Sequence, residues 1–149
     1  MSLQHLSRRG WQLAAVLAVV ACGLEHDRSE SKDPTEPKGP KHEAQAWLRA
    51  NQNPSPLASN RFGPKQRAVA FIDSVYQLRA ETVYVVNVEE DSSWILQEGG
   101  PYADALWIRL PSDPALRAGL FAVDEREARG EGFDPDRDHG QQYLYFWWD

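Results

Sequence analysis

The single cysteine, Cys22, is the feature that most constrains how this 149-residue chain folds. One cysteine cannot form a disulfide bond within the chain, so the fold has to be stabilised by the packing of apolar side chains. The same count excludes metal sites that need several thiolates. Because Cys22 directly follows an apolar run, its role is expected to lie outside the folded domain.

The first 21 residues have the three zones of a bacterial export signal. Arg8 and Arg9 form a cationic start, residues 11–21 are apolar, and small residues precede the cysteine. Eleven helical residues rise only about 16 Å, roughly half of a hydrocarbon core, so this run is too short for a transmembrane helix. The sequence therefore predicts a signal peptide over residues 1–21.

The segment Val19-Val20-Ala21-Cys22 resembles the lipobox of bacterial lipoproteins. This resemblance implies that the Cys22 thiol receives a diacylglycerol and that palmitate-like acyl chains hold the mature protein on a membrane of the cell envelope. An ordinary signal peptide followed by a chance cysteine is the alternative. Residues 7–11 also resemble the start of a twin-arginine signal, which leaves the export route open, and Gly23 favours the outer membrane.

Charge and histidine content limit the chemistry of the mature chain. The sequence has 16 basic and 22 acidic residues; Arg8 and Arg9 leave with the signal, so 14 basic residues remain against 22 acidic ones, a net charge of −8. Such a surface repels phosphate backbones, which argues against nucleic acid as a partner. Of the four histidines, only His139 lies beyond the predicted tether. No cofactor is predicted.

Residues 22–42 are predicted to form a disordered tether behind the lipidated cysteine. They are charged, contain Pro34, Pro37 and Pro40, and have too few apolar side chains to form a core. The remaining residues, 43–149, are expected to form one small α+β domain.

Apolar spacing within residues 43–149 predicts alternating helices and strands. Helices are expected over 43–50, over 65–79, and from Pro114 to Gly130, the last capped by Ser112 or Asp113 with a buried stripe of Leu116, Leu120 and Val123. Strands are expected over 57–61, 82–88, 105–110 and 141–148. In the connection 89–104, the apolar patch Trp94-Ile95-Leu96 could add a further strand.

The order strand, helix, strand, strand, helix, strand is that of a ferredoxin-like βαββαβ sandwich, with two helices on one face of an antiparallel sheet. This assignment depends on the strand 57–61, which follows Pro54 and Pro56. Without that strand, the same elements form a three-stranded sheet with two helices.

Strand alternation predicts a sheet face rich in aromatic side chains. If Leu106, Ile108, Leu110, Leu144 and Phe146 face the helices, the opposite face carries Trp107, Tyr143, Tyr145 and Trp147. Tyr84, or else Val83 and Val85, joins them according to the strand register. So large an apolar patch requires a cover. The candidates are the amino-terminal segment with Trp47, the 89–104 connection with Trp94, a second copy of the chain, a partner protein, or an apolar or sugar-like ligand.

Acidic residues suggest two further sites. Asp134, Asp136 and Asp138 resemble the start of an EF-hand calcium loop, although the glycine comes one place late and Tyr145 occupies the closing glutamate position; a solvated acidic turn is the alternative. Glu89, Glu90, Asp91 and Asp104 lie at the two ends of the 89–104 connection and would converge if that hairpin closes. They form either a carboxylate pair or a charged rim.

Nothing in the sequence marks a hydrolase. Ser92, Ser93 and Ser112 have no nucleophile-elbow motif and no identifiable histidine partner. The leading hypothesis is a non-enzymatic, lipid-anchored lipoprotein that binds another protein or itself, as a homodimer, through the aromatic sheet face. The alternative is a small-ligand-binding domain or an enzyme with a pocket between sheet and helices, to which Asp104 or His139 contributes.

Overall fold

The computed structural model describes residues 34–148. The predicted signal peptide, the lipidation site Cys22, Gly23 and most of the predicted tether lie outside the described residues. Of the helices that the structure does describe, none combines the length and the apolar character needed to cross a membrane.

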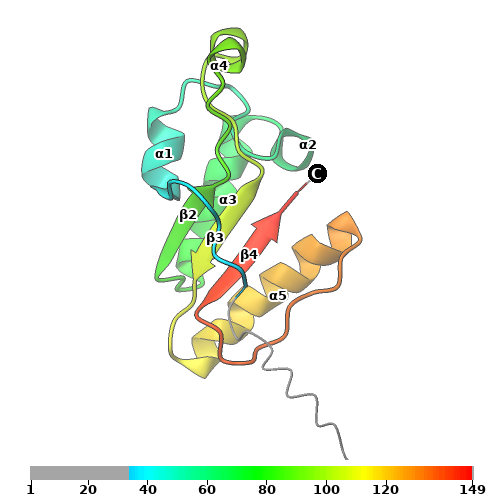
Figure 1. Ribbon diagram of the computed structural model, residues 1–149. Helices are drawn as coiled ribbons and strands as arrows, with labels where there is room; N and C mark the ends of the chain where they lie inside the picture. The colour runs from blue at the N-terminus through cyan, green and yellow to red at the C-terminus, as the bar shows by residue number, and fades with distance from the viewer. Residues whose placement is uncertain (1–33, 149) are drawn as a thin grey trace, which may run out of the picture.

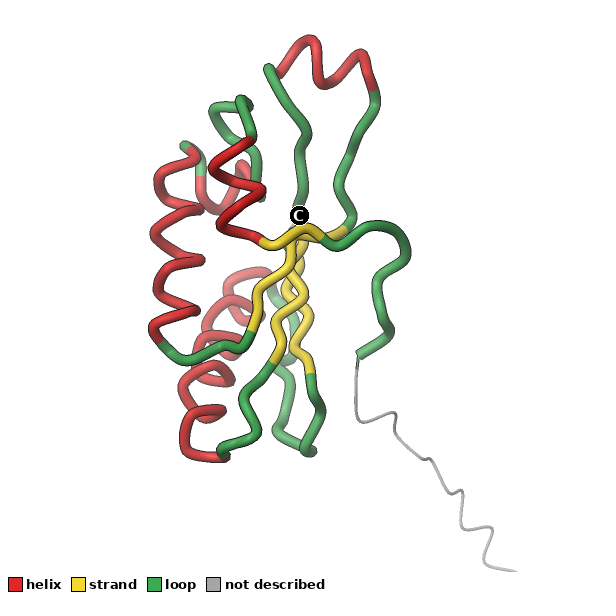
Figure 2. The backbone as a smooth tube through the Cα atoms, turned by 90° about the vertical axis from the view of Figure 1, so that its left-hand side faces the viewer, coloured by secondary structure: helices red, strands yellow, loops and turns green. Residues whose placement is uncertain are grey.

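The core of the molecule is a four-stranded antiparallel sheet with the order β1-β2-β3-β4. Its strands are β1 (His42–Glu43), β2 (Thr82–Val86), β3 (Ala105–Arg109) and β4 (Tyr143–Trp147). The helices α1 (Ala44–Ala50), α3 (Lys65–Gln77) and α5 (Pro114–Glu131) lie on one side of this sheet (Figures 1 and 2). The predicted α+β fold, an antiparallel sheet with helices on one face, is confirmed.

The first strand of the sheet lies elsewhere than predicted. Leu57 makes only an isolated bridge to Ala103, and the chain then enters the short helix α2 (Ser59–Phe62). Pro54 and Pro56 have no backbone N–H to donate, which disfavours a regular strand here. The first strand is instead β1, at the boundary between the predicted tether and the predicted domain. As a result the strands follow one another in chain order, and β3 and β4, which α5 connects, pair directly.

Local signals in the sequence set the helix ends. Glu43 caps α1 by accepting hydrogen bonds from the amides of Gln45 and Ala46, and Asp113 caps α5 through the amide of Ala115. The carboxyl end of α5 differs from the prediction, because the left-handed residue is Gly132 (φ 82°) while Gly130 remains helical. The predicted stripe of α5 is also wrong at Leu116, which is 40% exposed.

The apolar patch at residues 94–96 is helical, so the extra strand predicted there is wrong. It belongs to α4 (Ser92–Glu98), which Asp91 caps and which ends at Gly99 in a left-handed conformation. Residues 87–104 form an arm that carries α4 at its tip, beyond the end of the sheet (Figure 1). Backbone hydrogen bonds between Glu89 and Tyr102 hold the two sides of the arm together.

Two buried asparagines fix the arm just after α4. Asn51 donates from Nδ2 to the carbonyl of Pro101 at 2.8 Å, and Asn53 donates from Nδ2 to the carbonyl of Gly100 at 3.3 Å. A Cβ atom on Gly100 would lie 2.3 Å from Oδ1 of Asn51, so only glycine allows this approach.

The two faces of the sheet carry the side chains that alternation predicts. Leu106, Ile108, Leu110, Leu144 and Phe146 belong to the core between sheet and helices. The opposite face has a second cluster of Val86, Ala105 and Trp107, against which Tyr84, Tyr143 and Tyr145 pack. The register thus places Tyr84 on the aromatic face and Val83 and Val85 on the helix side. Trp107 stacks on Tyr143, with ring centroids 4.8 Å apart.

The chain itself covers this aromatic face. Residues 34–41, here called the strap, cross the sheet on the side opposite the helices before entering β1 (Figures 1 and 2). Pro34 and Pro37 in the strap are half-buried, and Trp107 is only 2% exposed. Residues 34–42, assigned to the tether from the sequence, thus lie against the sheet in the described part of the chain.

Neither tryptophan proposed as a cover takes part. Trp47 packs against the core on the helix side, and Trp94 is 55% exposed on α4. The amino-terminal segment was one of the candidate covers, and part of it does lie on this face. That part is the strap, which precedes Trp47 in the chain.

Candidate functional site

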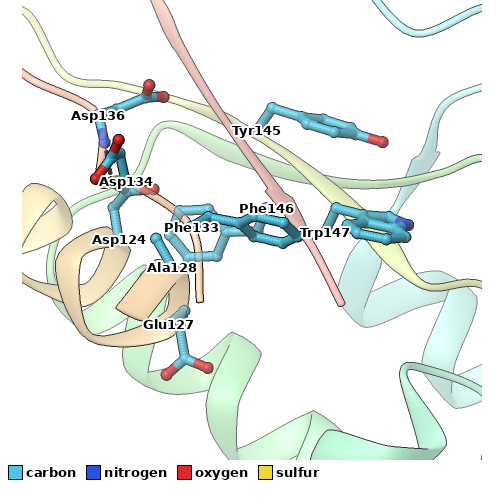
Figure 3. Close-up of a pocket in the computed structure, with 9 residues that line it drawn as sticks. All are labelled: Asp124, Glu127, Ala128, Phe133, Asp134, Asp136, Tyr145, Phe146 and Trp147. Carbon is cyan, nitrogen blue, oxygen red and sulfur yellow. Dashed lines mark hydrogen bonds between the residues drawn. The ribbon is translucent and has the colours of Figure 1, made fainter. Parts of the chain in front are cut away.

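A cleft of about 310 Å³ lies along the outer edge of β4. The edge strand forms one wall, and the carboxyl-terminal half of α5 with the loop that follows it forms the other (Figure 3). We call this feature the acidic cleft. Its charged lining residues are Asp124, Glu127, Asp134 and Asp136, and its aromatic ones include Phe133, Tyr145 and Trp147.

The end of α5 determines which side chains meet in the cleft. Asp124 lies on α5 among residues that face the sheet, with Val123 and Glu127 also buried. Gly132 then turns the chain out of the helix, so the next residues run back past α5. The backbone amide of Asp136 donates to Oδ2 of Asp124 at 2.8 Å, which fixes the loop beside the helix. Figure 3 shows the side chains of Asp124, Asp134 and Asp136 gathered on one side of the cleft.

Burial perturbs two carboxyl groups of the cleft, those of Asp124 and Asp136. It raises the pKa of Asp124 to about 6, and the charge of Asp136 adds to this effect, while the hydrogen bond from the Asp136 amide opposes it. Burial also raises the pKa of Asp136, against the influence of His139. Among the side chains of residues 34–148 that line the cleft, none is a lysine or an arginine. The three aspartates thus create a negative potential that no basic side chain in the cleft offsets.

Glu127 has a separate, structural role. Its side chain points away from the aspartates (Figure 3) and accepts two hydrogen bonds from Arg61, at 2.8 and 3.1 Å. Further hydrogen bonds come from Nε of Arg126 at 3.1 Å and from Nε1 of Trp148 at 3.3 Å. Burial alone would raise the pKa of Glu127, but the hydrogen bond and charge of Arg61 lower it below its ordinary value. Glu127 therefore ties α5 to α2 and to the end of the chain.

Two exposed rings border the cleft. Phe133 and Trp147 are 46% and 37% exposed, with ring centroids 5.6 Å apart. The indole Nε1 of Trp147 donates to Oδ2 of Asp104 at 3.2 Å, and the hydroxyl of Tyr145 accepts from Nδ2 of Asn87 at 2.8 Å. These contacts fix the rings of β4 in place, so the aromatic wall is preformed.

The residues of the predicted aromatic surface fall into two groups. Trp107 is covered and Tyr143 is half-buried against it, so they are part of the packing beneath the strap. Tyr145 and Trp147 line the cleft. The predicted binding surface is therefore divided, and its accessible part lies at the edge of the sheet.

The three aspartates of the calcium-like loop also separate. Asp134 and Asp136 line the cleft, whereas Asp138 forms a two-point ion pair with Arg117, at 2.8 Å from Nε and 2.6 Å from Nη2. In the part of the chain that the structure describes, no three Asp, Glu, His or Cys side chains come together as a set of metal ligands.

Part of the predicted acidic group in the arm does converge. Glu89 and Asp104 line a cavity of about 540 Å³ that runs along the arm, together with Glu98, Trp94 and Tyr102. Asp91 instead caps α4, and Glu90 is exposed. Asp104 accepts the hydrogen bond from Trp147.

The remaining candidate residues lie apart from one another. His139 is exposed in the loop before β4, where its backbone amide donates to Oε1 of Gln141. Ser92 and Ser93 are in α4, and Ser112 precedes the cap of α5. Within residues 34–148, none of these serines forms a hydrogen bond with His139.

Sequence reasoning missed Asp124, Glu127 and Phe133. The signal that was available is the spacing of Asp124 and Glu127 next to Leu120 and Val123, which places two acidic residues at the border of an apolar stripe. Comparisons with protein families, with curated proteins and with solved structures found no match.

Proposed function

We propose that this chain is a non-enzymatic, lipid-anchored lipoprotein of the bacterial cell envelope that binds a positively charged group in the acidic cleft. The observation that carries this proposal is the gathering of Asp124, Asp134 and Asp136 beside the exposed rings of Phe133 and Trp147. Carboxylates attract a cation by charge, and an aromatic face adds a cation–π contribution of about 0.5–2 kcal/mol.

The cleft is large enough to hold a small charged group. Its volume of about 310 Å³ is at the lower end of the range for ligand pockets, roughly 300–1,000 Å³. The guanidinium or ammonium group of a partner fits this size and the charge of the walls. The leading hypothesis was protein binding, and the alternative was a pocket between sheet and helices. This proposal combines the two, because the cleft lies between a helix and the sheet.

Self-association through the aromatic face receives less support. The strap crosses this face of the sheet and Trp107 is only 2% exposed, so a homodimer through this face would first have to displace residues 34–41. The proposed envelope location depends on the lipobox-like segment and on Cys22. Incorporation of labelled palmitate into the cellular protein, and its loss in Cys22→Ser, would test that part of the proposal independently.

Binding can be tested with a matched pair of small probes. N-acetyl-arginine amide and its neutral analogue N-acetyl-citrulline amide are titrated into protein lacking residues 1–22 while nuclear magnetic resonance follows the indole N–H of Trp147. We expect shifts with the arginine probe only, and at least roughly tenfold weaker binding in the Asp124→Asn/Asp136→Asn variant, which corresponds to about 1.4 kcal/mol.

Glu90→Gln is the control for that titration, because it removes one negative charge, against two in the double variant, from an exposed position outside the cleft. It should bind the arginine probe as the unmodified protein does. Equal shifts with both probes, or none with either, would contradict the proposed cation site.

A further inference from the structure

We infer that the partner is an extended polypeptide that pairs with the outer edge of β4 and places a lysine or arginine side chain in the acidic cleft. This inference rests on the proposed function and specifies the chemical class of the ligand. It joins two observations at the same place: a charged cleft and an available strand edge.

The strand β4 is the last in the sheet order, so it has a neighbour, β3, on one side only. Within residues 34–148, no strand pairs with its other side. Edge strands present backbone N–H and C=O groups that can pair with an added strand. Chains that bind in this way obtain their affinity from main-chain hydrogen bonds and their specificity from side-chain pockets.

The register shows which backbone groups of β4 face outward. At one end of the pair the amide of Leu110 donates to the carbonyl of Gln142, and at the other the amide of Trp148 donates to the carbonyl of Asp104. Hydrogen-bonded pairs in an antiparallel ladder alternate with pairs that are not hydrogen-bonded. The backbone groups of Tyr145 and Trp147 therefore point away from β3, toward the cleft side of the strand.

The position of the cleft allows it to bind a side chain of the added strand. Both faces of β4 contribute to its lining, through Phe146 on the helix side and through Tyr145 and Trp147 on the opposite side. Successive side chains of a strand alternate between the two faces. A basic residue that turns toward α5 would meet Asp124 and Asp136, while its neighbours would lie beside the rings of β4.

Charge favours a basic partner over a second copy of this chain. Two β4 edges paired with each other would bring two sets of cleft aspartates close together, and like charges facing each other are destabilising. The excess of acidic over basic residues in the whole chain acts in the same direction. A segment that contains lysine or arginine offers backbone hydrogen bonds to the strand edge and a positive charge to the cleft.

The test uses a capped peptide of six residues in which lysine alternates with valine. One derivative has norleucine in place of each lysine, which removes the charge. Two others carry N-methyl groups on alternate backbone amides, one at the odd and one at the even positions. Affinity is measured by calorimetry with protein lacking residues 1–22, and hydrogen exchange of the Tyr145 and Trp147 amides is measured with and without the parent peptide.

We expect the parent peptide to bind, the norleucine peptide to bind at least about tenfold more weakly, and only one of the two methylated peptides to lose affinity. Losing one or two backbone hydrogen bonds corresponds to a loss of about tenfold. The amides of Tyr145 and Trp147 should exchange more slowly in the complex.

The outcomes separate the two proposals. If both methylated peptides bind as tightly as the parent and the two amides are not protected, strand addition is wrong, while the cation site stands. If neither the peptide nor N-acetyl-arginine amide binds, the proposed function fails together with the inference. Dimerisation of the free chain with protection of the same two amides would make a second copy the occupant and overturn the inference.

Discussion

The backbone amide of Asp136 donates a hydrogen bond to the carboxylate of Asp124, with 2.8 Å between the nitrogen and Oδ2. This contact holds the loop after α5 against the helix and places two acidic side chains side by side. Burial raises the pKa of both carboxyl groups. A cation bound between these two carboxylates would lower both pKa values.

Asp124→Asn should change how stability depends on pH. Between its ordinary pKa of 3.8 and its folded value of about 6, Asp124 retains a proton in the folded chain that the unfolded chain releases. The stability contributed by this proton is therefore lost as pH rises through that window. Asparagine does not titrate, so the variant does not lose this stability. The free energy of unfolding of Asp124→Asn minus that of the unmodified protein should therefore rise by about 1–2 kcal/mol between pH 4 and pH 7, after allowance for solvent screening.

Denaturant unfolding at several pH values measures this difference. Glu90→Gln serves as the control, because it removes one carboxylate from an exposed position outside the cleft. A constant difference between Asp124→Asn and the unmodified protein from pH 4 to pH 7 would show that the folded-state pKa of Asp124 is not raised.

Arg61→Met should destabilise the fold by about 2–4 kcal/mol, because it leaves Glu127 buried without its principal cation. The double variant Arg61→Met/Glu127→Gln should lose less stability than the sum of the two single variants. Arg109→Met is the matched control, since the ion pair between Arg109 and Glu81 is exposed and contributes below about 1 kcal/mol. If the losses in the double-mutant cycle are additive, Arg61 and Glu127 are not energetically coupled.

Gly100→Ala should loosen the arm. The added Cβ would lie 2.3 Å from Oδ1 of Asn51 and 2.8 Å from the backbone nitrogen of Asn53, so we expect a loss of about 2–3 kcal/mol and faster hydrogen exchange in α4. Gly130→Ala makes the same change in α5, where no atom lies within 4 Å, and should stabilise by about 0.5–1 kcal/mol. If the two substitutions change the free energy of unfolding equally, the neighbours of Gly100 can move aside without loss of stability.

Removing the strap should uncover the aromatic face. We compare a protein that begins at residue 34 with one that begins at residue 42. The shorter protein should lose about 1–3 kcal/mol of stability, bind a hydrophobic dye, and show a red-shifted tryptophan emission, because Trp107 becomes accessible to water. Identical dye binding by the two proteins would show that the strap does not protect this face.

Much of the sheet could be predicted from the sequence because strand alternation has a strict period of two. That period separated Leu106 and Ile108 from Trp107, and the structure confirms the division. The cap and start of α5 were equally predictable, since Asp113 followed by proline is a local signal. Such features depend on neighbours in the chain, which the sequence displays directly.

Other features depend on contacts between distant segments. The strand β1 has only two residues, and its pairing with β2 makes it a strand; His42 and Glu43 carry no pattern of their own. The apolar residues 94–96 would fit a strand or a helix. The cap at Asp91 and the left-handed Gly99 favour the helix. The cleft requires Asp124 and Asp136 to meet, which depends on where α5 ends.

The strap also determines which side of the domain the membrane anchor would approach. If Cys22 carries lipid, the roughly 12 residues from there to Pro34 can span at most about 40 Å, and they join the domain on the face of the sheet opposite the helices. Tension on the anchor would act first on residues 34–41, so the domain would yield there before its sheet is disturbed.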